Sequence, residues 1–424
     1  MIEELKYSKN NQSENYFQKL LNENNKDNQI KKKEIHNNNH KIIHILFLIT
    51  LIFFIDKSEK DYKNYIMKKG EFLPEGFINE NFYTEFEKTK ENYIKYPELE
   101  PYLNQIKILS HVYHSSINIA KKNKTNVHVS MALNGDYDYP ILVSICSALE
   151  NCILNKTFLT YHIFVGPEIT NFTIYILRSL ITKYPFNFEI IFYDMGNTFI
   201  ELYNKRMTQA TYYRLLAPVI INEDKLIYLD GDTLVLNDLS EMYQYPFGKN
   251  YVLGFLDFGY NSIDYLGIYT DKYINAGVLL LNLEKIRKDS KVFEVLDIIK
   301  KKIYLEKEDQ TLINYAFYPG VDRLPSKYVM FNFVDEEDVK IYLKNIRAKL
   351  EIEEFIEAIK NPTVIHLILC TPKVWFRKTR AKIALTGCKK RNDCKCDKDQ
   401  NLWYYYAQQT YYYDEITKFY RIWK

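Results

Sequence analysis

The chain has little net charge, few cysteines and only one long apolar run, and these shortages exclude several classes of protein. Its 57 Lys and Arg nearly balance its 54 Asp and Glu, which leaves a formal net charge of +3. No overall basic field therefore favours nucleic acid as a partner. Six cysteines in 424 residues are too few for a disulfide scaffold. No internal repeat is visible, and the length is ample for one large core or two domains.

The first 125 residues do not show the pattern of a folded core. Residues 1–41 are rich in Asn, Lys, Glu and Gln, so we expect a disordered cytoplasmic tail. The apolar run at 42–55 would span roughly 21 Å, which is short of a ~30 Å bilayer core but fits a thin membrane. A core helix and a cleaved signal fit its polar surroundings less well than a short signal-anchor helix. Residues 56–125 are charged and aromatic, and we predict a stem that includes a helix at 104–121.

From Asn126 onward the sequence alternates between strand and helix patterns. Apolar strands separated by amphipathic helices are typical of βαβ units, in which helices cover both faces of a parallel sheet. The predicted strands are 126–133, 158–165 and 188–192, and the predicted helices are 139–151 and 169–183. We therefore predict an α/β domain whose ligand site lies at the carboxyl ends of the strands.

Two aspartates follow a further predicted strand, Leu226–Leu229, and give the first indication of chemistry. Asp230 and Asp232 lie one residue apart, and a second apolar strand comes after them. On a strand they would point to the same side, where two carboxylates repel each other unless a cation lies between them. Hard cations such as Mn²⁺ or Mg²⁺ take oxygen ligands and often bridge to substrate phosphates. The alternative is a polar hairpin turn, because Asp-Gly is a common turn dipeptide.

Four signatures in a fixed order resemble glycosyltransferase family 8, the retaining enzymes that include glycogenin and bacterial lipopolysaccharide galactosyltransferases. They are Ala210–Pro218, Tyr228–Asp232, Tyr273–Leu283 and Glu308–Asn314. The resemblance covers roughly residues 126–380. It implies an α/β GT-A fold, with a Rossmann-like mixed sheet flanked by helices, one nucleotide-sugar site and a Mn²⁺-type ion.

The resemblance also implies which residues hold the metal and the donor. Asp230, Asp232 and His366 would bind the metal, since a neutral imidazole suits Mn²⁺, although His366 alone could be a satisfied buried histidine. Arg214 would contact the donor sugar and phosphate, and Lys373 would neutralise the departing diphosphate. The full set expected around the nucleotide-sugar is Ala132, Asn134, Asp136, Tyr137, Arg214, Asp230, Gly231, Asp232, Asn275, Ala276, Gly277 and Lys373.

Asp309 and Gln310 open a predicted amphipathic helix with Leu312, Ile313 and Phe317 facing inward. The resemblance places this pair beside the sugar ring, with Asp309 on the hydroxyls and Gln310 facing the anomeric carbon. The residues predicted for catalysis are therefore Gln310, Asp309 and Arg214. For Asp309 the alternative is a carboxylate favoured by the helix dipole at a helix start. Because an amide is a poor nucleophile, we expect front-side attack within a tight ion pair rather than a covalent intermediate.

The sequence departs from the family pattern at two places. The family usually has Asp where Asn134 stands and Asn where Asp136 stands, and an Asn can still accept a bond from the base or ribose. The family also closes on His-x-x-Gly-x-x-Lys-Pro-Trp. Here the stretch from His366 to Trp375 lacks the Gly, has one extra residue and carries Val374 in place of Pro.

The last segment, residues 386–424, is a cysteine-containing and aromatic extension. Three cysteines lie among Lys and Asp residues without a nearby His, which favours a disulfide from Cys388 to Cys394 or Cys396 over a zinc site. The stretch from Trp403 to Lys424 is predicted to be helical. It would either close the core or cover an acceptor groove.

Together these features predict a retaining hexosyltransferase that uses a UDP-sugar and Mn²⁺ or Mg²⁺, with a catalytic domain at 126–385. The acceptor would be a hydroxyl of a glycan, lipid or protein, and no nucleic acid is expected. The anchor predicts a single-pass type II membrane protein of the Golgi or ER with a lumenal catalytic domain. One alternative is a non-catalytic nucleotide-sugar-binding relative. The other is a haloacid dehalogenase-type phosphatase, whose motif needs Thr or Val two residues beyond the second Asp, where this chain has Leu234.

Overall fold

A mixed sheet of eight strands forms the centre of the computed structural model, with strand order β1-β4-β3-β2-β5-β8-β7-β9. Within it β4, β3, β2 and β5 are parallel to one another, whereas β8 runs antiparallel to both β5 and β7. The predicted α/β class with a mixed sheet is confirmed. The structure describes residues 99–112, 120–133, 137–167, 171–185, 187–202, 208–257, 263–333, 336–369, 373–375 and 391–421.

The central strands form because their sequences are apolar and rich in β-branched and aromatic residues. All nine residues of β3 are buried, as expected for a parallel strand with helices on both faces. The strands expected at 126–133, 158–165, 188–192 and 226–229 are all present as β2 to β5. The strand bounds are β1 Lys107–Val112, β2 Thr125–Leu133, β3 Thr157–Val165, β4 Phe188–Asp194, β5 Lys225–Leu229, β7 Val252–Leu256, β8 Ile274–Asn282 and β9 Val321–Arg323.

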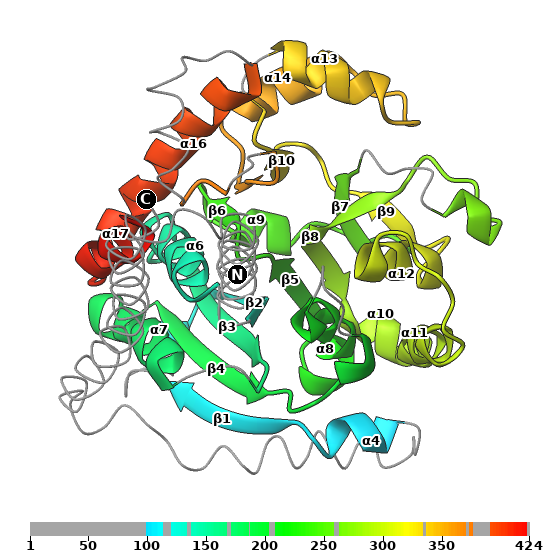
Figure 1. Ribbon diagram of the computed structural model, residues 1–424, viewed down its shortest axis with the longest axis horizontal. Coiled ribbons are helices and arrows are strands. Elements are labelled where there is room, and N and C mark those ends of the chain that lie inside the picture. Colours follow the sequence, from blue (N-terminus) through cyan, green and yellow to red (C-terminus); the bar gives the residue numbers. More distant parts are fainter. Residues whose placement is uncertain are drawn as a thin grey trace, which may run out of the picture. The chain divides into compact units, whose positions relative to one another are not determined.

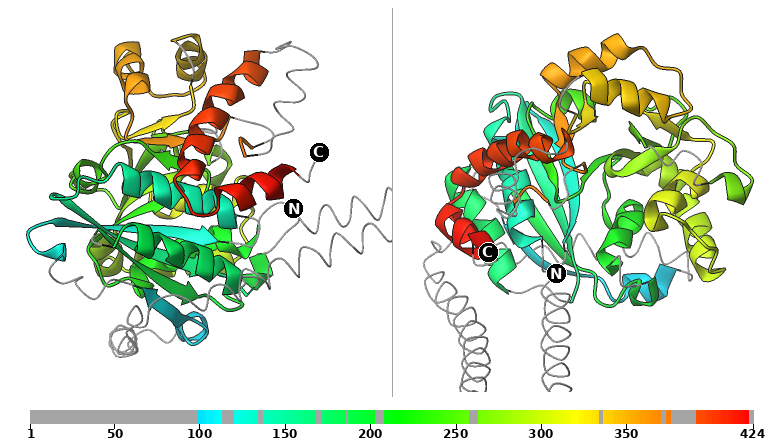
Figure 2. Two further views of the ribbon diagram at one scale, coloured as in Figure 1. Left: turned by 90° about the vertical axis from the view of Figure 1, so that its left-hand side faces the viewer. Right: turned by 45° about the horizontal axis from the view of Figure 1, so that its top comes forward.

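Helices lie on both sides of this sheet, as Figures 1 and 2 show. On one side α6 (Asp138–Glu150) and α7 (Asn171–Lys183) contact each other, β2 and β4, and both were expected from the sequence. On the other side the eight-residue 3₁₀ helix η5 contacts β2 and β3, and α12 contacts β8. The remaining bounds are α4 Glu100–Leu103, η4 Ile200–Leu202, η5 Gln209–Leu216, α8 Ala217–Ile220, α9 Ser240–Tyr243, η6 Asp264–Leu266, α10 Leu283–Lys288, α11 Lys291–Lys300, α12 Glu308–Ala316, α13 Glu336–Lys344, α14 Ile352–Lys360, α16 Arg391–Gln408 and α17 Tyr413–Arg421.

A second, three-stranded sheet has the order β10-β11-β6 and determines where the functional residues meet. Its strands are β6 (Thr233–Val235), β10 (Val329–Phe331) and β11 (Val364–His366). In the antiparallel pairing of β11 with β6, Thr233 lies opposite His366. The strand that begins directly after Asp232 therefore pairs with the strand that ends at His366.

Two expectations about secondary structure were wrong. The helix predicted at 104–121 is instead a strand over Lys107–Val112, which pairs antiparallel with β4 at the sheet edge. The hairpin alternative for the Asp-x-Asp motif also fails, because β5 and β6 belong to different sheets. Asp230, Gly231 and Asp232 form the turn at which the chain leaves the large sheet for the small one.

The tail, the apolar run at 42–55 and most of the stem lie outside the described residues, as do Cys388 and the side chains of Cys394 and Cys396. Within the described ranges, no helix combines the length and the apolar character needed to cross a bilayer. The membrane anchor, the lumenal location and the disulfide stay predictions. The helical expectation for the C-terminal stretch is confirmed over α16 and α17.

Candidate functional site

Three predicted metal ligands meet at the junction of the two sheets. Ligand atoms of Asp230, Asp232 and His366 all lie within 4.8 Å of one another. The imidazole Nε2 of His366 is 3.2 Å from Asp232 Oδ1 and 4.0 Å from Asp230 Oδ2. Asp232 and His366 are 6% and 3% exposed, so the protein rather than solvent fixes their positions. Two carboxylates and one imidazole form a donor set that fits a Mn²⁺- or Mg²⁺-type ion.

Backbone contacts hold this cluster together. The carbonyl of Asp232 accepts a hydrogen bond from the amide of Leu367 (2.9 Å), which extends the β6–β11 pairing beyond His366. On the other side the amide of Asp230 donates to the carbonyl of Gly277 (2.7 Å), where β5 meets β8. The three candidate ligands are therefore held at the ends of β5, β6 and β11, whose register is set by main-chain hydrogen bonds.

Two glycines at the cluster leave room that no other residue would leave. A Cβ on Gly277 would lie 2.2 Å from His366 Cε1 and 2.7 Å from Asp230 Oδ2. A Cβ on Gly231 would lie 2.7 Å from Cδ1 of the Tyr137 ring. Real carbon atoms do not approach so closely, so both positions need glycine for steric reasons.

Arg214 lies beside the cluster and joins one of its acids, Asp230, to Asp309 on α12. It is 6% exposed, and its Nη2 donates to Asp230 Oδ1 (3.0 Å) while its Nε lies 3.3 Å from Asp309 Oδ2. Its guanidinium also covers the ring of Tyr228 at 3.9 Å and bonds the carbonyl of Ala276. Its burial shows that Arg214 does not serve as a surface salt bridge. Arg214 braces Asp230 so that its other oxygen, Oδ2, faces His366.

Asp309 and Gln310 begin α12, as the sequence predicted, and lie against the first residues of β8. The Oε1 atom of Gln310 accepts hydrogen bonds from Asn275 Nδ2 (3.1 Å) and from the amide of Ala276 (3.2 Å). Its Nε2 donates to the phenol of Tyr273 (3.3 Å). The amide of Gln310 is therefore fixed in one orientation.

Asp309 is 3% exposed and carries an unusual pKa. Burial raises the pKa of its carboxyl, the Arg214 charge opposes this, and the nearby Asp230 adds to it, so the pKa of Asp309 reaches about 7. Arg214 compensates only partly because it is shared with Asp230. The carboxyl thus titrates close to neutral pH.

Lys373 reaches the cluster from the altered closing motif. Its ammonium group contacts Asp232 Oδ2, on the side of the carboxylate away from His366. Burial alone would raise the pKa of Asp232, but the charge of Lys373 and the contact with His366 hold that pKa well below its usual range. The extra residue in this motif therefore does not keep Lys373 from the site.

At the end of β2, the structure describes two of the four residues expected around the nucleoside. Ala132 is half-buried in β2, and Tyr137 immediately precedes α6, with its ring beside Gly231 and edge-on to Trp375 (5.7 Å between ring centroids). Asn134 and Asp136 lie outside the described residues.

Sequence reasoning did not single out Asp257 and Lys307, which border the site. Asp257 accepts hydrogen bonds from Asn275 Nδ2 and from Lys307 Nζ, both at 2.8 Å, and is 5% exposed. It directly follows β7, so an acid at the end of an apolar strand, the signal that identified Asp230, could have identified it as well.

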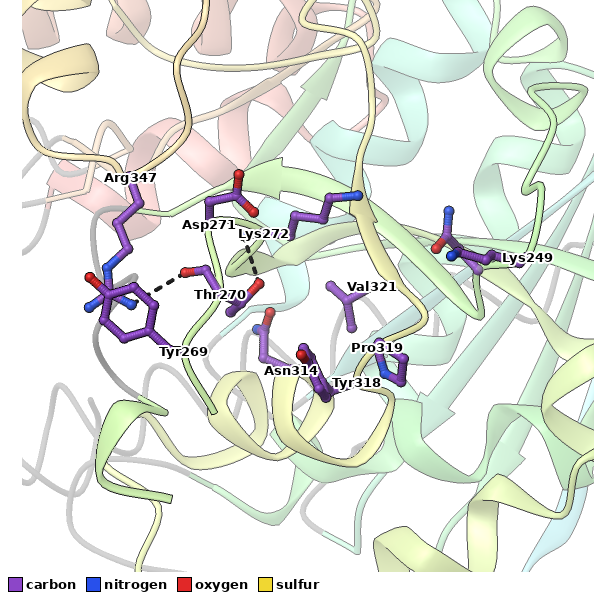
Figure 3. Close-up of a pocket in the computed structure, with 11 residues that line it drawn as sticks. Lys249, Tyr269, Thr270, Asp271, Lys272, Asn314, Tyr318, Pro319, Val321 and Arg347 are labelled. Carbon is purple, nitrogen blue, oxygen red and sulfur yellow. Dashed lines mark hydrogen bonds between the residues drawn. The ribbon is translucent and has the colours of Figure 1, made fainter. Parts of the chain in front are cut away.

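A cavity of about 630 Å³ opens elsewhere, between the segment before β8 and the end of α12. None of the predicted site residues lines it. Figure 3 shows Arg347 against the ring of Tyr269, with Asn314 and Tyr318 across from them. α12 contributes to both places, Gln310 to the cluster and Asn314, one turn later, to this cavity. Of the described residues that the sequence proposed for the donor, Arg214, Gly231, Gly277 and Lys373 lie at the cluster, and none lines this cavity.

Comparisons with known proteins agree with this geometry. The model of the family described as "Glycosyl transferase family 8" matches residues 128–379. General stress protein A of Bacillus subtilis is 24% identical over 195 residues, which cover 44% of this chain and 66% of that protein. Glycosyltransferase GlyB of Streptococcus pneumoniae is 23% identical over 242 residues, which cover 56% of this chain and 55% of that protein. Each match therefore leaves a third or more of the relative uncovered.

A solved structure shares the fold. The apo structure of the WbbM bifunctional glycosyltransferase superposes with a TM-score of 0.52 at 20% sequence identity, covering 69% of this chain and 51% of that one. At this identity the likeness supports the GT-A fold alone.

Proposed function

Because the chain belongs to glycosyl transferase family 8, we propose that it moves a hexose from a UDP-sugar to an acceptor hydroxyl and retains the anomeric configuration. Family membership makes the chain a glycosyltransferase. The hexose, the uridine nucleotide and the metal are the proposed part. These proposals are supported by the positions of Asp230, Asp232 and His366, whose ligand atoms lie within 4.8 Å of one another beside Lys373.

The three ligands fit a divalent cation in number and in chemistry. A divalent ion held by them would neutralise the diphosphate and so stabilise UDP as it departs. Lys373, in contact with Asp232, would add a further positive charge on the same side. Gly231 and Gly277 keep the ligands close, because a side chain at either position would collide with the cluster or with Tyr137.

The chain's own residues would orient the donor sugar. Asp309, one position before Gln310 on α12, would accept hydrogen bonds from sugar hydroxyls when ionised. Gln310 already accepts two hydrogen bonds at Oε1, so its amide is fixed and remains a poor nucleophile. This supports front-side attack within a tight ion pair, in which the Gln310 amide stabilises positive charge at the anomeric carbon.

The decisive experiment compares Asp232→Asn with the unchanged protein in a donor panel. UDP release from UDP-Glc, UDP-Gal, UDP-GalNAc and UDP-GlcA is measured with Mn²⁺. We expect Asp232→Asn to lower kcat/KM at least ~100-fold, because an amide is a weaker metal ligand than a carboxylate. Asp224→Asn is the matched control, because Asp224 has a side chain that is 74% exposed and lies outside the cluster. Equal UDP release by Asp232→Asn would remove the metal assignment.

A non-catalytic nucleotide-sugar-binding protein is the second candidate, which the altered closing motif permits. Calorimetry that detects UDP binding with no turnover of any donor in the panel would support this candidate against the transferase. The phosphatase alternative is not retained, because the chain belongs to a glycosyltransferase family. A glycan hydroxyl is the proposed acceptor, and the lumenal location stays a prediction.

A further inference from the structure

The C-terminal helix α16 holds the segment that carries Lys373. The amide Nε2 of Gln400 donates to the carbonyl of Val374 (2.7 Å), and the phenol of Tyr404 donates to the carbonyl of Trp375 (2.8 Å). Gln400 and Tyr404 are four residues apart and so lie on one face of the helix. One helix face therefore bonds both residues that directly follow Lys373.

Ring contacts add to these hydrogen bonds. The indole of Trp375 lies between the ring of Tyr137 and the indole of Trp403, with centroid distances of 5.7 and 5.9 Å. Val374, Trp375 and Trp403 are 0%, 3% and 1% exposed. Lys373 is thus the end of a segment anchored in a packed core, although its own side chain is 28% exposed.

α16 is also tied to the strands that present the metal ligands. Its Asp399 accepts a hydrogen bond from Asn332 Nδ2 (2.6 Å), and Asn332 Oδ1 accepts one from the amide of Leu369, three residues after His366. The phenol of Tyr406 accepts a hydrogen bond from Asn151, which also donates to the carbonyl of Val235 at the end of β6. Figure 1 shows α16 beside α6 and close to β6. The helix therefore bonds both the segment of Lys373 and residues next to the strands that flank Asp232 and His366.

We propose that Gln400 and Tyr404 are positioning residues that hold Lys373 over the diphosphate side of the site. The inference rests on the proposed function, in which Lys373 neutralises the departing diphosphate. In the resembled motif a proline follows the lysine and stiffens the chain by its ring. Here Val374 stands in that position, and hydrogen bonds from a helix beyond the family match restrict the segment instead.

The first test measures the placement of Lys373 without relying on turnover. Lys373 is acetylated at trace level and followed by mass spectrometry in the unchanged protein and in Tyr404→Phe, Gln400→Leu and the double variant. We expect labelling of Lys373 to accelerate at least ~5-fold in the double variant, because the ammonium group leaves Asp232 more often. Lys301, whose side chain is 63% exposed, serves as the internal reference. Tyr405→Phe is the matched control, since Tyr405 is 53% exposed on the same helix.

The second test is a double-mutant cycle on kcat/KM for the donor. A single lost hydrogen bond of about 1 kcal/mol corresponds to a ~5-fold loss for Tyr404→Phe. Lys373→Ala should lose more, and adding Tyr404→Phe to it should cost nothing further, because both changes remove one interaction. Full additivity would identify Tyr404 as a merely structural residue and overturn the inference.

The outcomes of the two tests distinguish a failure of this inference from a failure of the proposed function on which it rests. Unchanged labelling of Lys373 in the double variant, with the melting temperature retained, overturns the positioning role alone. Wild-type activity in Lys373→Ala would instead remove Lys373 from the proposed mechanism while leaving the labelling result intact. Tyr404→Phe keeps the ring and removes only one hydroxyl, so it tests the inference even where Gln400→Leu disturbs folding.

Discussion

At the scale of single residues, Gly277 tolerates less change than its flexible character suggests. Its missing side chain leaves the space that the His366 ring and the Asp230 carboxylate occupy. The sequence identifies this glycine only as one of the residues expected around the nucleotide-sugar. The structure gives a different reason, which is that two candidate metal ligands pack against its Cα.

Gly277→Ala should therefore disable the site while the fold persists. The new Cβ would force the His366 ring or the Asp230 carboxylate to move, because it would lie 2.2 Å from His366 Cε1. We expect Mn²⁺ affinity, measured by calorimetry, to fall at least ~10-fold. Gly254→Ala on the adjacent strand is the control, because its Cβ would meet side-chain ends of Ile274 and Leu279 at 3.1 Å. Equal Mn²⁺ affinity in both variants and in the unchanged protein would contradict the assignment.

The two contacts that Arg214 makes with acids could not be predicted from its sequence motif. The resemblance predicts contact with the donor, which stays a prediction. What the structure adds is that one guanidinium bridges Asp230 and Asp309, so the candidate metal cluster and helix α12 share a cation. Changes at Arg214 will therefore alter both acids together.

At the scale of elements, strands β2, β3 and β4 carry a buried chain of polar side chains. His128 Nδ1 lies 3.0 Å from His162 Nε2, and His162 Nδ1 lies 3.0 Å from the phenol of Tyr193. Burial lowers the pKa of His128 to about 4, against the attraction of Glu189, while Lys121 adds to the lowering. Because of this low pKa, the stability of the folded sheet depends on pH.

The pH dependence of stability follows from that shift. An unfolded His128 would titrate near 6.5, so between pH 4 and 6.5 the unfolded state binds more protons than the folded state. Its contribution to stability is complete above pH 6.5 and is lost as pH falls toward 4, by up to about 3 kcal/mol. His128→Gln should flatten the unfolding free energy over this window in urea titrations. Identical pH slopes for the variant and the unchanged protein would show that another group is responsible.

At the scale of the whole molecule, the cluster exists only when distant segments assemble. Asp232 comes from the turn between the sheets and His366 from the end of β11, and only the β6–β11 pairing brings them together. An unfolded chain would offer no such ligand set, so a divalent cation should bind the folded state selectively.

The effect of a divalent cation on the stability of the whole protein tests this expectation. Mn²⁺ at a hundred times its Kd should stabilise the folded state by about 2.7 kcal/mol, seen as a rise in Tm. Excess chelator should reverse the rise, and Asp232→Asn should abolish it, whereas Asp224→Asn should keep it. A Tm that does not respond to Mn²⁺ in the unchanged protein would mean that the cluster binds no ion of this type.

Much of the fold was predictable because its signals are local. Hydrophobic alternation located β2 to β5, α6 and α7, and the run from Glu308 predicted α12. The strand at Lys107–Val112 was missed because its residues pair with β4, and nothing in its own sequence indicates that partner. Asp257 was missed because its importance comes from contacts with Asn275 and Lys307 on other elements.

The sequence by itself determined most of the central strands and helices, the family and the identities of the candidate ligands, since periodicity and motif order can be read along the chain. Only the tertiary structure decided that Asp232 faces His366, that Arg214 serves two acids, and that α16 holds the segment of Lys373. These contacts depend on β-sheet pairing and helix packing between residues far apart in the chain. Hydrogen bonds of that kind are set by the register of folded strands, which no local pattern of residues specifies.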